Sequence, residues 1–157
     1  MKAADDKRWM TRALELAREA GDRGETPIGA VIVCDGEIVA EAGNHKELSQ
    51  DPLGHAEVIA IRKAAEKLGR WRLSGCSVYV TLEPCTMCSG AIIHARLERV
   101  IYGATDPKAG AVTSLYQILA DPRLNHAPEV IGGVMEAESA ALLKDFFKSL
   151  RANPKPR

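Results

Sequence analysis

The chain has 157 residues, a length typical of one domain that buries its own hydrophobic core. Its 21 basic and 21 acidic side chains give a formal charge of zero, which argues against a protein that binds nucleic acid or membranes through its overall charge. No stretch approaches the roughly 18 consecutive apolar residues of a membrane span, so we expect a cytoplasmic protein that does not contact a membrane.

The first third of the chain predicts a helix followed by a strand hairpin. Apolar residues recur at helical spacing over residues 5–20, and Gly21 is a stop signal. The apolar run 28–33 and the partly alternating run 37–42 flank the turn dipeptide Asp35-Gly36, which predicts two hairpin strands. The first strand should be buried on both faces, and this requires helices on both sides of the sheet.

The next segment should bring a histidine to the start of a second helix. Residues 43–54 are polar and show no periodicity, so they predict a loop that leads to His55. An apolar stripe at helical spacing then extends over residues 57–68 and ends at Gly69. His55 is therefore expected at the helix entry, where the backbone is not yet helical.

The second half of the chain alternates strands and helices. Residues 77–82 are rich in β-branched and aromatic side chains and predict the central strand. Pro84 is favoured at the first helical position, which places Cys85 and Cys88 in the first turn of a helix that continues to Leu97. Strands at 99–103 and 129–134, a short helix at 114–120 and an amphipathic helix at 136–150 complete the predicted elements.

This order of elements predicts an α/β fold with a mixed sheet between layers of helices. The chain shows no internal repeat, no low-complexity segment and no linker before its last residues. We therefore expect a single domain over residues 1–151, followed by a frayed basic tail at 152–157.

Two short motifs, at residues 55–57 and 84–88, carry the chemistry. The imidazole of His55 and the sulfurs of Cys85 and Cys88 provide three protein ligands, and three ligands leave the fourth tetrahedral position open for water, as a catalytic zinc ion requires. The two cysteines are three residues apart and share one helix face. A helix N-terminus also favours the thiolate form that zinc binds.

Glu57 is the expected proton carrier of this site. Zinc lowers the pKa of a bound water from about 15.7 to about 7, so a neighbouring carboxylate can take its proton and deliver it to the substrate. The pattern H-x-E followed by P-C-x-x-C is typical of zinc-dependent nucleobase deaminases.

Two other uses of the cysteines remain open from spacing alone. A thioredoxin-like redox pair also places C-x-x-C at a strand-to-helix turn, but it gives His55 and Glu57 no role. A structural zinc site would need a fourth ligand, for which Cys34 or Cys76 is available, although both lie at strand edges where a small buried residue is the ordinary occupant.

Asn44 is the other polar residue expected beside this site. It follows a strand and opens the loop that leads to His55, so its amide can hydrogen-bond a ligand in the pocket. A turn-forming asparagine fits the same position equally well.

With these motifs the chain resembles the bacterial tRNA adenosine deaminases of the cytidine-deaminase-like superfamily, which convert the wobble adenosine of an anticodon to inosine. The matching positions are spread over nearly the whole chain: residues 27–31, 44, 51–52, 55–57, 81–88, 90–94, 103–104, 106–108, 125–126 and 145–147. The resemblance implies a three-layer α/β/α sandwich around a mixed five-stranded sheet and one zinc ion per subunit. It also implies a homodimer and a tRNA anticodon stem-loop as partner.

The resemblance further implies a set of substrate contacts. Asn44 should bond the base or the ribose of the flipped adenosine, and Ile28 should pack on the base. The remaining contacts are the backbone at Ala56 and Glu83, for the edge of the base, and Asp106 and Phe147, for the flanking nucleotides.

The predicted function is therefore zinc-dependent hydrolytic deamination of adenosine in tRNA, with attack at C6 of adenine. One alternative is a deaminase of a free nucleobase or nucleoside, of guanine or cytosine type. Another is a non-catalytic RNA-binding module that zinc stabilises. Two departures from the family pattern, Leu53-Gly54 before His55 and the loop 46–50, lie beside the expected substrate and bear on its identity rather than on the chemistry.

The C-terminal residues give a separate indication of RNA binding. Lys148, Arg151, Lys155 and Arg157 follow Asp145 without an acidic neighbour, which suits a surface that faces phosphates. A solvated terminus accounts for the same pattern equally well.

Overall fold

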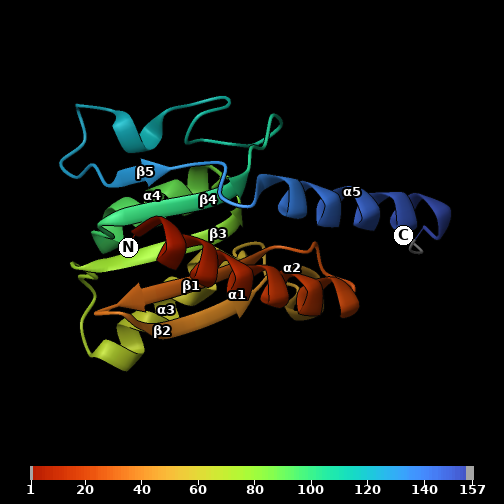
Figure 1. Cartoon of the computed structure of the whole chain (residues 1–157), viewed down its shortest axis with the longest axis horizontal. Coiled ribbons are helices and arrows are strands. Elements are labelled where there is room, and N and C mark those ends of the chain that lie inside the picture. The colour runs from red at the N-terminus through yellow and green to blue at the C-terminus, as the bar shows by residue number, and fades with distance from the viewer. Residues whose placement is uncertain (1, 155–157) are drawn as a thin grey trace.

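Residues 2–154 are described by a computed structural model, in which five strands form one mixed sheet with helices on both faces (Figure 1). The elements are α1 (Lys2–Asp22), β1 (Gly29–Cys34), β2 (Glu37–Gly43), α2 (Lys46–Ser49), α3 (Ala56–Leu68), β3 (Cys76–Leu82), α4 (Thr86–Ala95), β4 (Arg99–Ala104), a 3₁₀ turn η1 (Ile118–Ala120), β5 (Glu129–Ile131) and α5 (Glu136–Ala152).

The strands are arranged in the order β2-β1-β3-β4-β5. β1 pairs antiparallel with β2 and β3, whereas β3, β4 and β5 run parallel to one another. The prediction of a mixed five-stranded sheet, with the strand at 77–82 in its centre, is confirmed.

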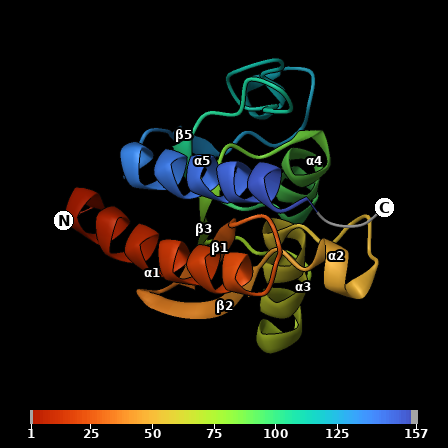
Figure 2. The same ribbon diagram turned by 90° about the vertical axis from the view of Figure 1, so that its right-hand side faces the viewer.

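Helices cover the two faces of the sheet in pairs. α1 and α5 pack on one face, and α3 and α4 lie on the other (Figures 1 and 2). Because successive side chains of a strand point to opposite faces, neighbouring residues of β1 belong to different hydrophobic clusters. Val31 shares its cluster with Met10 of α1, while Ile32 shares the other with Ala60 of α3 and Ile92 of α4. The three-layer α/β/α sandwich is therefore confirmed.

The turn between β1 and β2 explains the hairpin. Asp35 and Gly36 both have left-handed backbone conformations, with φ of 52° and 75°. Two left-handed residues form a type I′ turn, whose twist matches that of paired strands. All six residues of β1 are buried, as predicted for a strand covered on both faces.

Several element boundaries differ from the predicted ones. α4 begins at Thr86, two residues after Pro84, because Cys85 is extended and caps the helix. The predicted helix at 114–120 is reduced to η1, and the predicted strand at 129–134 ends at Ile131, shortly before Gly133 turns the backbone left-handed at φ 84°.

Two further boundaries concern the loop before His55 and the C-terminus. The predicted loop at 43–54 contains the short helix α2. α5 extends to Ala152, the first residue of the predicted tail, and residues 155–157 lie outside the described part of the chain. Over residues 2–154, no helix combines the length and apolar character needed to cross a bilayer.

Candidate active site

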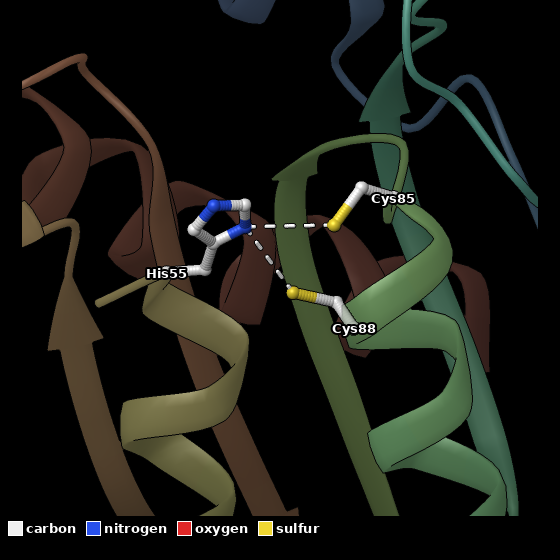
Figure 3. A group of neighbouring side chains, drawn as sticks. All are labelled: His55, Cys85 and Cys88. Carbon is white, nitrogen blue, oxygen red and sulfur yellow. Dashed lines mark hydrogen bonds between the residues drawn. The ribbon is translucent and has the colours of Figure 1, made fainter. Parts of the chain in front are cut away.

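The two predicted motifs meet where α3 and α4 begin (Figure 3). His55 caps α3 with an extended backbone, at φ −79° and ψ 144°, and Cys85 caps α4 in the same way. Nδ1 of His55 lies 3.5 Å from Sγ of Cys85 and 3.5 Å from Sγ of Cys88. The prediction that His55 lies at a helix entry is confirmed.

The separations among these three donors fit one zinc ion. The ligand atoms all lie within 4.8 Å of one another. Zinc bonds of about 2.3 Å to sulfur and about 2.0–2.1 Å to nitrogen, at tetrahedral angles, place nitrogen and sulfur about 3.5 Å apart. The cluster can therefore hold a metal ion with three protein ligands.

The other two cysteines lie too far away to complete a four-ligand structural site. Cys34 and Cys76 are paired with each other across β1 and β3. Cys76 is the first residue of β3 and Cys85 follows its far end, a separation of about 20 Å at the usual rise of a strand. Both Cys34 and Cys76 are buried, as expected of small core residues.

Hydrogen bonding within the cluster favours a thiolate at Cys85. The hydrogen bond from Cys88 is the largest influence on the Cys85 thiol and, together with His55, lowers its pKa to about 4 although burial opposes this. The hydrogen bond to Cys85, followed by burial, raises the pKa of Cys88. The bond to Cys85 also raises the pKa of His55. A thiolate is the form in which cysteine binds zinc.

Glu57 lies beside these donors without belonging to them. Its side chain is only 4% exposed, and burial is the main cause that raises the pKa of its carboxyl group. A raised pKa makes an ionised carboxylate a stronger proton acceptor, which suits a group that takes a proton and passes it on. Glu57 is thus suited to acid and base catalysis.

A pocket of about 520 Å³ opens beside the cluster, and its lining includes His55, Glu57 and Cys85. This volume lies within the usual range for small-ligand sites. Five of the six residues predicted to contact the substrate also line the pocket: Ile28, Asn44, Glu83, Asp106 and Phe147.

Ala56 is the predicted contact that does not line the pocket. It is fully buried, and its backbone N–H donates a hydrogen bond of 2.9 Å to Oδ1 of Asn44. The side-chain oxygen of Asn44 is thereby occupied. Its amide NH₂ is the group that remains for a ligand.

Three basic residues of the pocket come from three different segments. Lys46 belongs to α2, Lys108 to the loop after β4, and Arg151 to the last turn of α5. The sequence patterns did not single out Lys46 or Lys108. One sequence signal for these lysines was available. Lys46 lies two residues after the predicted contact Asn44, and Lys108 lies two residues after the predicted contact Asp106. Arg151 was part of the basic C-terminal pattern.

Comparisons with known proteins identify the family of this chain. Residues 4–151 match the MafB19-like deaminase family. The tRNA-specific adenosine deaminase of Bacillus subtilis (strain 168) is 46% identical over 150 residues, which cover 96% of this chain and 93% of that protein. The tRNA-specific adenosine deaminase of Agrobacterium fabrum is 49% identical over 148 residues, which cover 94% of this chain and 97% of that protein.

Solved structures show the same relationship. A structure from studies of A-to-I editing by tRNA:A34 deaminases superimposes with a TM-score of 0.84 at 51% identity, over 87% of this chain and 99% of that one. A guanine deaminase from Nitrosomonas europaea, with a TM-score of 0.78 at 21% identity over 89% of this chain and 83% of that one, shares the fold alone. From the extent and level of these identities, the chain belongs to the family of tRNA-specific adenosine deaminases.

Proposed function

We propose that this protein is a zinc-dependent hydrolytic deaminase that converts adenosine to inosine at the wobble position of a tRNA anticodon. The observation that carries the proposal is the buried carboxyl group of Glu57 beside the His55, Cys85 and Cys88 donors in one pocket. Its relatives with 46% and 49% identity are named for this reaction, which supports the choice of substrate.

His55, Cys85 and Cys88 would hold one zinc ion per subunit. When bound, zinc supplies an activated water by lowering the pKa of that water to about 7. Glu57 accepts a proton from the water and delivers it to the base. The oxygen adds to C6 of adenine as a hydroxyl group, and the first proton stays on the ring. The hydroxyl proton then passes to the amino group, the bond between C6 and that group breaks, and ammonia leaves, so adenosine and water become inosine and ammonia.

The charges around the pocket favour a polynucleotide over a free base. The lining has three acidic residues, Glu57, Glu83 and Asp106, of which the first two are buried and the third is half-buried. Its three cations, Lys46, Lys108 and Arg151, are exposed, so they are the charged groups that an approaching strand can reach. A neutral nucleobase offers no anionic partner for these groups, whereas an RNA strand brings phosphates on both sides of the flipped nucleotide. This supports tRNA over the free-base alternative.

The substrate contacts follow the family resemblance and the pocket lining. The amide NH₂ of Asn44 would bond the base or the ribose, and Ile28 would pack on the base. The backbone at Glu83, for the edge of the base, and Asp106 and Phe147, for the flanking nucleotides, also belong to residues of the lining. The backbone at Ala56 is proposed for the edge of the base from the resemblance alone, because Ala56 does not line the pocket. We also propose a homodimer located in the cytoplasm, with residues 1–151 forming a single domain in each subunit.

The substrate is tested by incubating the purified zinc-loaded protein with an anticodon stem-loop, and separately with adenosine, guanine and cytosine. We expect inosine from the stem-loop and no comparable ammonia release from the free compounds. Ammonia from a free base, without inosine in the stem-loop, would replace the proposal with a free-base deaminase.

Glu57→Ala separates an enzyme from a zinc-stabilised binding module. Because Glu57 is not among the metal donors, the variant should keep one zinc equivalent and lose deamination by about 10²- to 10⁴-fold. The control variant His55→Ala should lose zinc and activity together. A Glu57→Ala protein that binds the stem-loop and deaminates it at the wild-type rate would disprove the proposed proton carrier.

A further inference from the structure

Two segments that line the pocket, the start of α2 with the residues before it and the loop after β4, are each held by a single buried glutamate. One segment, at 44–48, contributes Asn44 and Lys46 to the pocket, and the other, at 105–114, contributes Asp106 and Lys108. Most backbone N–H groups of these segments are not paired with a strand of the sheet, so they need hydrogen-bond acceptors elsewhere. In both segments these acceptors include one carboxylate from elsewhere in the chain.

Glu83 holds the loop at 105–114. Its Oε2 accepts backbone N–H groups from Val112, Thr113 and Ser114 at 3.1, 2.8 and 2.9 Å. Its Oε1 accepts the N–H of Asp106 at 2.9 Å and the hydroxyl of Ser114 at 2.6 Å. One carboxylate thus receives five hydrogen bonds from both ends of the loop.

The surroundings leave the Glu83 carboxylate little freedom to move. The residue is only 2% exposed. A Cβ atom added at Gly110 would collide with the carboxyl carbon and with both oxygens, so glycine at this position makes room for the carboxylate. Asp106 then caps the adjacent turn, because its Oδ1 accepts the N–H groups of Lys108 at 3.1 Å and Ala109 at 3.2 Å.

Glu25 holds the other segment in the same manner. It is 1% exposed, and its carboxylate accepts the backbone N–H groups of Lys46 and Glu47 at 3.1 Å each and of Leu48 at 2.7 Å. These bonds fix the backbone of Lys46, two residues after Asn44. Hydrogen bonds to a charged acceptor are stronger than neutral ones, so both glutamates impose well-defined loop conformations.

We propose that Glu83 and Glu25 are positioning residues, which set the two substrate-binding loops in place before RNA arrives. Ordering flexible loops during binding lowers affinity, and loops that are ordered in advance avoid this loss. The inference rests on the proposed function, because it assigns a role in RNA binding. Neither carboxylate belongs to the metal donors or takes part in the proton transfer.

Glu83→Gln is the primary test, because glutamine keeps the shape of the side chain and removes the charge and one acceptor oxygen. In the zinc-loaded protein without RNA, we expect hydrogen exchange at the amides of 106 and 112–114 to become faster by about 10-fold or more. With an anticodon stem-loop, KM should rise by about 10- to 100-fold, while kcat stays within about threefold and zinc content is unchanged.

The split between KM and kcat distinguishes positioning from simple destabilisation. A variant that was only less stable would contain less active protein, which lowers the apparent kcat and leaves KM unchanged. If Glu83→Gln does not fold, Ser114→Ala is measured in its place, since it removes one hydroxyl bond to Oε1 and keeps the charge. It should raise KM by about 2- to 10-fold.

Glu25→Gln is the matched partner and Glu129→Gln the control. Glu25→Gln should speed hydrogen exchange at the amides of 46–48 and leave the amides of 112–114 protected. Glu83→Gln should speed exchange at 112–114 and leave 46–48 protected. Glu129 is an exposed glutamate of β5 that pairs with Arg99 at 3.2 Å and lies outside the pocket, so its variant should leave both loops and KM unchanged.

The outcomes separate this inference from the proposed function. The positioning role would be overturned if the loop amides stayed protected from hydrogen exchange in both variants. It would also be overturned if the amides lost protection while KM stayed equal to that of wild type. If wild-type protein does not deaminate the stem-loop, the proposed function fails instead, and the exchange measurements still decide whether the two carboxylates hold the loops.

Discussion

The side-chain oxygen of Asn44 accepts the backbone N–H of Ala56 at 2.9 Å and so ties the residue after β2 to the first residue of α3. His55 caps that helix, so this bond lies immediately beside the backbone that presents the imidazole to Cys85 and Cys88. Asn44 also lines the pocket. One side chain thus connects the metal donors with the substrate site.

Substitutions of Asn44 should separate its hydrogen bond to Ala56 from its contact with a ligand in the pocket. Asn44→Asp keeps the acceptor oxygen and loses the NH₂ donor, so we expect a free energy of unfolding within about 1 kcal/mol of wild type and a clear loss of activity on the stem-loop. Asn44→Ala leaves the buried N–H of Ala56 without its acceptor and should also cost about 1–3 kcal/mol of stability. Urea unfolding and inosine formation measure the two effects; equal stability losses in both variants would show that the bond to Ala56 is unimportant.

Removing the metal should destabilise the protein reversibly. A ligand that binds only the folded state stabilises it by about 4 kcal/mol when present at about 1,000 times its dissociation constant. Treatment with a chelator should therefore lower the Tm, and added zinc should restore it.

Cysteine variants provide the control for metal binding. Cys88→Ala should abolish zinc binding, whereas Cys34→Ala should keep one zinc equivalent, because Cys34 lies outside the donor cluster. Zinc content and thermal unfolding are measured on the same samples. Loss of zinc from Cys34→Ala would contradict the three-donor site.

Binding of the stem-loop should weaken steeply as salt increases. Each phosphate contact to single-stranded RNA contributes a slope of about 0.7 to the plot of log affinity against log salt concentration. Arg151→Gln should therefore reduce the slope by about 0.7 if its guanidinium meets one phosphate. Lys67→Gln is the matched control, because Lys67 is an exposed residue of α3 outside the pocket. Equal slopes for wild type and Arg151→Gln would exclude a phosphate contact at Arg151.

The two loop-holding glutamates should make stability fall in acid. Burial alone would raise the pKa of Glu25, but the N–H bonds from Leu48, Glu47 and Lys46 outweigh it and lower the pKa. Burial likewise opposes the hydrogen bonds from Ser114, Asp106 and Thr113 to Glu83, which lower its pKa to about 2. A lowered pKa in the folded state contributes stability above the unfolded value of about 4.3, and that contribution disappears as the pH falls through the folded value.

We therefore expect the free energy of unfolding to drop between about pH 4.3 and pH 2. Glu25→Gln and Glu83→Gln should each flatten part of this pH dependence. Urea unfolding at several pH values, with a chelator present in every sample, removes the separate proton dependence of metal binding. A variant that retains the full acid dependence of wild type would rule out its glutamate as a contributor.

Much of the fold could be predicted because its signals are local. Asp35-Gly36 predicted the hairpin, since both residues readily adopt the left-handed conformation that the turn contains. The apolar run that became β1 predicted burial on both faces. By contrast, the predicted helix at 114–120 is reduced to η1, because the backbone there bonds outside the helical pattern: the N–H of Leu115 donates to the carbonyl of Gly110, and the N–H of Ile118 donates to the carbonyl of Ala111.

The sequence by itself determined the chemistry of the site. The residue types of H-x-E and P-C-x-x-C specify an imidazole, two thiols and a carboxyl group, and their spacing places each motif at a helix start. Only the tertiary structure decided that Asn44 bonds the first residue of α3, that Lys46, Lys108 and Arg151 share one pocket, and that two buried glutamates hold its loops. The physical reason is the range of the interactions: helix starts and turns depend on neighbouring residues, whereas loop amides and pocket charges find partners that are close only after the chain has folded.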